Sequence, residues 1–327
     1  MYTQKNLDRI FFEVDLEPIF IENNLFVKKD EHQTEQYLFS NDLRNQIYKP
    51  VEKYKALIRV DTGHVFTIVT NNYKVITYQE AYEFGKKCFA IVFNTVTWDD
   101  MELFNITTTQ TCSVCHIDIV HKSKKQDIFA GDTWFPFIRI TNSYNKTKAL
   151  QFSYGFARGI CKNGIIFNTK AIEIKLYHSK GVDIEASVFN VDYSEIQKLE
   201  EEFIAQLYRL KKYYVDRRYV FALTCKALGI KIPSGDATSK QINAFIETQN
   251  DIDKLCEKYF DELGANAYMA FNVITDFASN PSSSRAYYMD SMQRKSHEWI
   301  EGFATEIKND NFTFEKYLGE YKDLIAS

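Results

Sequence analysis

The chain is poor in glycine and proline, with 12 Gly and 5 Pro among 327 residues. This scarcity argues against a disordered chain and favours long regular elements. The phosphate-binding motifs G-x-G-x-x-G and G-x-x-x-x-G-K-[ST] are absent, and so are the hydrolase motif G-x-S-x-G and the metalloprotease motif H-E-x-x-H. We therefore lean towards a non-enzymatic protein and keep an enzyme without a recognisable motif as a third hypothesis.

The six cysteines are few and unevenly spaced, which does not match a disulfide framework. Cys112 and Cys115 form a C-x-x-C pair that could begin a zinc site, but structural zinc needs a second ligand pair and the sequence offers none. A strand over this segment would also point the two thiols to opposite faces. We predict neither a metal nor another cofactor.

Long apolar runs are missing. The longest covers only the six residues Cys88–Phe93, whereas a membrane-spanning helix needs about 20. The first residues also lack a basic segment followed by an apolar one, the pattern of a secretion signal. We therefore expect no membrane contact and a cytoplasmic protein.

Aromatic residues are abundant, with 26 Phe and 21 Tyr, and many lie in a basic segment. Between His121 and Lys175 the chain has ten Lys/Arg and three acids, a local charge of +7 in a protein of formal net charge −4. Alternating apolar residues predict consecutive antiparallel strands here, with turns at 145–148 and 162–164 and a bulge near 168–171. The predicted strands are Trp134–Thr141, Ala149–Ile160 and Ile165–Leu176.

The periodicity along the chain predicts an α+β protein, with a mainly antiparallel sheet followed by a helical C-terminal region. We expect an acidic N-terminal arm over 1–54, a sheet core over 55–190 and a helical region over 191–327. A hairpin is predicted around Gly63. Thr77 and Glu80 have capping-box spacing and predict the start of one helix within the sheet core.

The basic segment suggests a function. Single-stranded nucleic acid is bound by cationic grooves with aromatic faces on which bases stack. The candidate binding residues are Arg139, Tyr144, Lys146, Lys148, Arg158 and Lys162. The competing interpretation is structural, because aromatic residues on a strand face usually pack in the core and Arg158 could satisfy buried acceptors.

Several short pieces resemble the family known as domain of unknown function 932, often labelled phage/plasmid-like protein. They include the run Asn142-Ser143-Tyr144-Asn145, the element Arg-x-x-Cys-x-Asn-Gly and a helical Asn-Val-Ile-Thr-Asp segment. The residues that carry this signature are Asn142, Cys161, Asn163, Asn272 and Thr275. The resemblance implies carriage on phage or plasmid-like elements and no established activity.

Two functional hypotheses follow. The first is a non-enzymatic mobile-element protein that contacts nucleic acid in replication, recombination or strand annealing. The second is a protein-binding effector, such as an inhibitor of a host defence complex. The oligomeric state is left open by the sequence.

Overall fold

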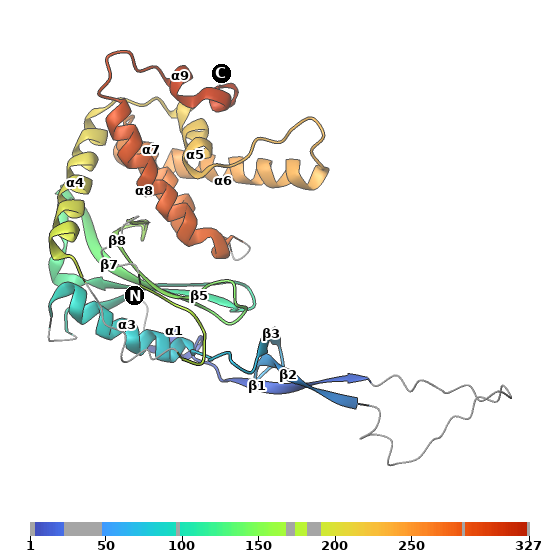
Figure 1. Ribbon diagram of the computed structural model, residues 1–327. Helices are drawn as coiled ribbons and strands as arrows, with labels where there is room; N and C mark the ends of the chain where they lie inside the picture. Colours follow the sequence, from blue (N-terminus) through green and yellow to red (C-terminus); the bar gives the residue numbers. More distant parts are fainter. Residues whose placement is uncertain are drawn as a thin grey trace.

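The computed structural model describes residues 4–22, 48–95, 99–167, 174–181, 191–282 and 285–325. Antiparallel sheets occupy the N-terminal half of the chain and helices the C-terminal half (Figure 1). The predicted α+β class is confirmed. Among the described helices, none is both long enough and apolar enough to cross a membrane.

The N-terminal part forms a three-stranded antiparallel sheet, which we call the wing. Gly63 has φ +69° in the predicted turn, so the hairpin is confirmed. Strand β2 runs through residue 54, where we had placed the end of an arm, because β2 pairs with β1 along most of its length. The elements are α1 (Gln4–Asp8), β1 (Val14–Glu22), β2 (Tyr48–Arg59) and β3 (Val65–Thr70).

The main sheet has the strand order β10-β8-β7-β5-β4, with all its pairs antiparallel. Short strands β6 and β9 pair with β7 and β8. The range of the third predicted strand contains most of β9 and all of β10, and the expected bulge near 168–171 lies outside the described residues. The strands are β4 (Met101–Thr108), β5 (Val114–His121), β6 (Gln126–Phe129), β7 (Asp132–Ser143), β8 (Leu150–Arg158), β9 (Gly164–Ile166) and β10 (Ile174–Leu176).

Helix α3 (Tyr78–Phe93) packs closely on one face of the main sheet. The capping box of Thr77 and Glu80 is confirmed at its start. A Cβ atom added to Gly85 would lie 2.1 Å from Cδ1 of Ile140, so the helix rests directly on strand β7. The alternation of apolar residues from Phe89 onward predicts a strand, but the buried face of α3 continues to Phe93.

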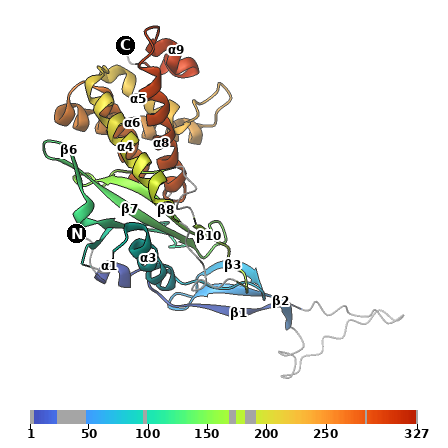
Figure 2. The same ribbon diagram turned by 60° about the vertical axis from the view of Figure 1, so that its left-hand side comes forward.

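Most of the helical region lies on the side of the main sheet away from α3 in Figures 1 and 2, and α4 and α7 also pack on Trp134 at one end of strand β7. All thirteen residues of α7 are buried, so α7 is its central helix. The sequence pattern predicts Ser194 as the cap of the first helix, but Asp192 caps α4. The pattern also predicts two helices, near Ser239–Phe245 and Asp251–Leu263, where α6 is continuous. The helices are α4 (Tyr193–Lys212), α5 (Val220–Leu228), α6 (Ser239–Leu263), α7 (Ala267–Ser279), α8 (Met289–Glu306) and α9 (Phe314–Leu318), with 3-10 turns η3 (Arg217–Tyr219), η4 (Ala286–Tyr288) and η5 (Gly319–Leu324).

Strand β8 is buried on both faces, which makes its one glycine sensitive to substitution. A Cβ atom on Gly155 would lie 2.0 Å from the carbonyl oxygen of Ile165 and 2.7 Å from the ring of Phe137. We predict that Gly155→Ala lowers the free energy of unfolding by about 1–3 kcal/mol or more, because the backbone must move. Urea unfolding followed by circular dichroism measures this loss.

Gly302→Ala is the matched control, since a Cβ on this residue of helix α8 meets no atom within 4 Å. It should stabilise the protein by roughly 0.5–1 kcal/mol through the better helix propensity of alanine. Equal effects of the two substitutions would show that strand β8 is not packed as described.

Candidate functional site

Three of the six predicted nucleic-acid residues lie inside the protein. Arg139, Tyr144 and Arg158 are each 1% exposed. The Tyr144 hydroxyl accepts a hydrogen bond from the backbone N–H of Tyr78 at 2.9 Å, and the two rings lie 4.2 Å apart. Phosphates and bases bind at surfaces, so the structure does not present these three side chains to a nucleic acid.

The three lysines of the prediction do not share one groove. Lys146 is exposed, and its Nζ donates to the carbonyl oxygen of Ile68 at 2.8 Å. Lys148 lies at the same turn, with its Nζ 4.7 Å from the ring centre of Tyr287. Lys162 follows the far end of the nine-residue strand β8, about 30 Å away along the strand.

Arg158 is held by carboxylates from both halves of the fold. Its Nε and Nη2 donate to the two oxygens of Asp132 at 2.7 and 3.0 Å, and Nη2 also donates to Glu262 at 2.5 Å. Tyr268 donates its hydroxyl proton to Asp132 at 2.7 Å and accepts from the indole N–H of Trp134 at 3.0 Å. Strand β7, strand β8 and helices α6 and α7 therefore meet at one buried guanidinium.

Asn163, between β8 and β9, and the family-signature residues of α7 converge beside this arginine. Nδ2 of Asn163 donates to the Tyr259 hydroxyl at 2.7 Å and lies 3.4 Å from the carbonyl oxygen of Asn272. The hydroxyl of Thr275 donates within α7, to the carbonyl oxygens of Phe271 at 3.0 Å and of Asn272 at 3.2 Å. Tyr259 in turn donates to Asp276 at 2.6 Å. The signature thus marks a structural junction between the sheet and α7.

The other two signature residues have different surroundings. Cys161 is half-buried, with its sulfur 3.8 Å from Nη1 of Arg158. Asn142 lies elsewhere, at the end of β7, where Nδ2 donates to the carbonyl oxygen of Ile76 at 2.8 Å. Asn142 therefore fixes the segment that leads into α3 and takes no part in the α7 junction.

Arg139 forms a second buried cluster on the opposite face of strand β7. Its Nε and Nη2 donate to the two oxygens of Asp118 at 2.6 and 2.7 Å. From helix α8, Gln293 accepts from Nη1, and Asp290 lies 3.8 Å from the same nitrogen. Arg294 of α8 completes this contact by donating to Ser153 on β8 at 2.9 Å. Helix α8 is thereby tied to the sheet.

Hydrogen bonds extend from the Arg139 cluster to Gly164, the residue after Asn163. Nε2 of Gln293 donates to the Ser279 hydroxyl at 2.7 Å, and that hydroxyl donates to the carbonyl of Gly164 at 3.1 Å. The backbone N–H of Gly164 returns a bond to the Ser279 oxygen at 2.8 Å. We call the connected set the buried polar layer. It joins the sheet to α6, α7 and α8.

Two histidines are buried beside this layer. His116 shares a hydrogen bond of 2.9 Å with the Thr141 hydroxyl. Burial lowers the pKa of His116 to about 3, and the nearby charge of Arg139 adds to this effect. Burial likewise lowers the pKa of His297 to about 4, assisted by Arg294. Both side chains are neutral at physiological pH.

The thiols do not form an obvious reactive or metal-binding site. Burial raises the pKa of Cys88 and Cys225 to about 12. Cys112 sits in a turn with φ 56°, and only Cys115 lies on strand β5, so our expectation of one strand carrying both was wrong. No group of three or more metal-ligating side chains occurs within the described part of the chain.

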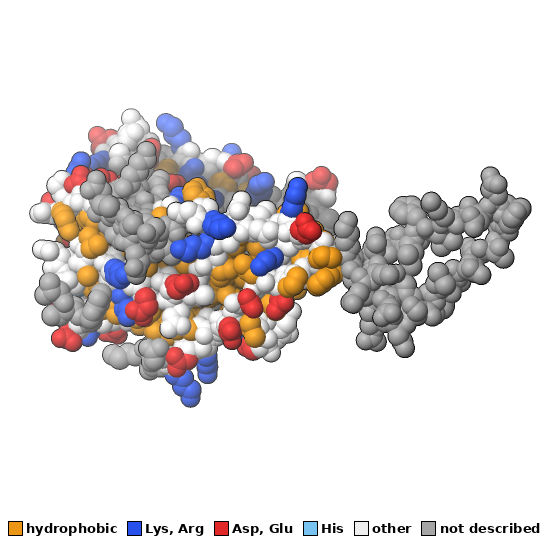
Figure 3. Space-filling view, turned by 60° about the horizontal axis from the view of Figure 1, so that its bottom comes forward, with side chains coloured by type: hydrophobic (Ala, Val, Ile, Leu, Met, Phe, Trp, Pro, Cys, Tyr) orange, Lys and Arg blue, Asp and Glu red, His pale blue; other side chains and the backbone are white. Residues whose placement is uncertain are grey.

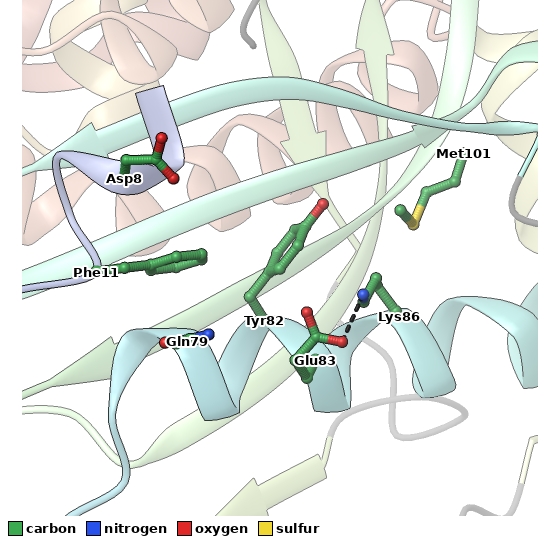
Figure 4. Close-up of a pocket in the computed structure, with 7 residues that line it drawn as sticks. All are labelled: Asp8, Phe11, Gln79, Tyr82, Glu83, Lys86 and Met101. Atoms are coloured by element: carbon green, nitrogen blue, oxygen red, sulfur yellow. Dashed lines mark ion pairs between the residues drawn. The ribbon is translucent and has the colours of Figure 1, made fainter. Parts of the chain in front are cut away.

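A pocket of about 550 Å³ opens at the surface between α1, α3 and β4 (Figure 4). Figure 4 shows Glu83 and Lys86 as an ion pair on α3 beside the ring of Tyr82, with Asp8 on α1 across the pocket. Of its charged side chains, Glu83 and Lys86 pair with each other. None of the lining residues belongs to the buried polar layer.

The sequence prediction missed the acidic partners of the two arginines. Asp118 lies within the otherwise apolar run of strand β5, and Asp132 opens strand β7 after a glycine. An acid inside a buried strand is costly unless a cation pairs with it, so each was a usable signal. Asp290 gave no comparable signal, because a charged residue in the first turn of a helix is common at surfaces.

The Arg158 cluster predicts a large stability effect. Arg158→Met leaves Asp132 buried without its cation, so we expect the free energy of unfolding to fall by about 3–5 kcal/mol. Asp132→Asn combined with Arg158→Met should cost less than the two single losses added together. Lys198→Met, which removes a solvent-exposed pair with Glu202, is the control and should cost under about 1 kcal/mol. An Arg158→Met loss as small as the control would contradict the buried pairing.

The two histidines predict the direction of the pH dependence. Their folded-state pKa values lie below the ordinary value of 6.5, so the unfolded chain binds more protons at mildly acidic pH. Stability should be full above pH 6.5 and fall as the pH drops towards 4, by up to about 1.4 kcal/mol per pH unit for each histidine. His116→Gln and His297→Gln should each flatten this dependence in urea titrations, while His64→Gln, at an exposed position, should not.

Comparison with known proteins gives one match. The family model described as domain of unknown function (DUF932) matches residues 65–299. No curated protein and no solved structure matches the chain. The matched range contains both arginine clusters and the junction with α7. The chain belongs to the domain of unknown function 932 family.

Proposed function

We propose that this protein contacts single-stranded nucleic acid at a corner formed by the β7–β8 turn and η4. The corner consists of Lys146, Lys148, Tyr287 and Tyr288. The observation that carries the proposal is an exposed aromatic ring next to lysines. Tyr288 is 57% exposed, its ring lies 5.0 Å from that of Tyr287, and Lys148 lies over the Tyr287 ring.

These side chains suit a ligand that offers phosphates and flat bases. An exposed tyrosine face can stack a base, and each lysine can neutralise a phosphate. Lys146 uses one of its donors on Ile68 and keeps two others. Strand register adds support, because Lys175 on β10 pairs with Gln151 and Gln151 with Thr141, at the same end of the sheet.

The buried polar layer supports this proposal by fixing the corner. Helix α8 begins at Met289, directly after η4, and its first turns are bonded to Arg139 through Asp290 and Gln293. The tyrosines of η4 are thus held over the sheet by a buried ion pair. A fixed platform loses little conformational entropy on binding.

The proposal keeps the hypothesis of a non-enzymatic protein that contacts nucleic acid, and it places the binding site at a different set of residues. Lys146 and Lys148 remain candidate binding residues. The buried Arg139, Tyr144 and Arg158 have a structural role in this proposal. Carriage on a phage or plasmid-like element, with action in the cytoplasm, remains part of this proposal. Replication, recombination and strand annealing all expose the single strands that such a corner would bind.

Fluorescence anisotropy with a labelled 20-nucleotide single-stranded DNA over a salt series tests the proposal. Lys146→Ala combined with Lys148→Ala should weaken binding and flatten the slope of log K against log salt by about 1.4. Tyr288→Ala should cost about 1–3 kcal/mol of binding free energy and leave that slope unchanged, because it removes stacking only.

Lys122→Ala combined with Lys125→Ala is the control, because both lysines are exposed beside the β5–β6 turn, away from the corner. This pair should leave binding nearly unchanged. The proposal fails if the wild-type protein does not bind the oligonucleotide at low salt and micromolar concentration, or if the control pair weakens binding as much as the corner pair.

A further inference from the structure

The outer face of the wing carries an apolar surface that no described element covers. Strand register places Ala56 beside Ile68 and Ile58 beside Val65. Val65 and Ile68 are each 52% exposed, and Tyr54, further along the same face of β2, is 45% exposed. Such a cluster of exposed apolar side chains marks an interaction surface when it has a distinct border.

A bulge in β3 brings these side chains onto one face. The register shifts between Leu57 and Ile58, so Phe66 and Thr67 fall together opposite Leu57 on the inner face. The inner face packs on the body of the protein, where Leu57 is fully buried and Phe66 contacts the ring of Tyr144. Val65 and Ile68 consequently both point outward.

Acidic residues border the apolar surface along β1. Asp15 pairs with Ile58 and Glu17 with Ala56, so both share the outer face, and Glu13 precedes them at the same spacing. All three are exposed. None of them forms an ion pair with a residue that the structure describes. Figure 3, which views the molecule from below β1 and β2 as they lie in Figure 1, shows hydrophobic patches with acidic and basic side chains among them.

We propose that the outer face of the wing binds a basic amphipathic helix of a partner protein. An apolar row beside an acidic row fits a helix with an apolar stripe flanked by Lys or Arg. From Tyr54 to Val60 the surface extends for about 20 Å, which matches a helix of about 13 residues.

Two observations favour this partner over other ligands. Nucleic acid is disfavoured because the row of Glu13, Asp15 and Glu17 repels phosphates. The surface differs in charge from the lysine and tyrosine corner, which adjoins it where Lys146 donates to the carbonyl oxygen of Ile68. Addition of a strand at the edge of β3 is disfavoured because Lys146 already occupies the carbonyl oxygen of Ile68.

Binding of a labelled 14-residue peptide tests this inference. The peptide has Leu at positions i, i+3, i+4 and i+7 and Lys elsewhere, and a second peptide carries Glu in place of Lys. The wild-type protein should bind the Lys peptide and not the Glu peptide. Glu13→Lys combined with Glu17→Lys should weaken the Lys peptide by about tenfold or more. Val65→Thr combined with Ile68→Thr should weaken it by a similar factor while keeping β-branched side chains in the strand.

Matched control variants on helix α6 distinguish binding at the wing from non-specific attraction of the peptide to acidic or apolar side chains. Glu247→Lys combined with Asp261→Lys makes the same charge change at exposed positions, and Ile242→Gln combined with Ile246→Gln removes exposed apolar side chains. Both controls should bind like the wild type. The inference is overturned if the controls lose as much affinity as the wing variants. It is also overturned if sedimentation shows that Glu13→Lys with Glu17→Lys dissociates a dimer, because a second copy would then be the occupant.

Discussion

The fold depends on two arginines that are charged and yet buried. Arg139 and Arg158 leave water only because each guanidinium is bonded to both oxygens of one aspartate. Removing two charges from water is expensive, and the cost is offset only when geometry is good and further donors are satisfied. Here the remaining donors point at Gln293 on α8 and Glu262 on α6. The hydrogen-bond donors of the two sheet arginines are therefore satisfied only when the helical region is packed on the sheet.

This dependence explains why the family signature lies where it does. Asn163 follows strand β8 and Asn272 lies in the middle of the fully buried helix α7, so their contact joins the two halves of the chain. An apolar junction would tolerate small shifts of α7, whereas directional hydrogen bonds among buried polar groups do not. The signature thus specifies how sheet and helices fit together, and it does not by itself indicate chemistry.

Local patterns in the sequence predicted the elements well and the site poorly. The capping box at Thr77 and the glycine turn at Gly63 depend on neighbouring residues, so both were visible. The burial of Arg158 depends on Glu262, more than a hundred residues away, and no local pattern records that contact. The same limit applies to Phe89, whose place in α3 is decided by packing on the sheet.

Charge counted along the sequence differs from charge presented at the surface. The +7 segment between His121 and Lys175 includes two arginines whose charge is neutralised inside by aspartates, and one of these, Asp118, lies outside the segment. The lysines of this segment that the structure describes lie at both ends of the main sheet, so the count of charges does not make them one continuous basic groove. The two surfaces that we propose as binding sites are smaller and differ in the sign of their charge. A lysine and tyrosine corner stands beside α8, and an acidic apolar face lies on the wing. Because the buried ion pairs fix α8 on the sheet, the first of these surfaces depends on the same interaction that holds the fold together.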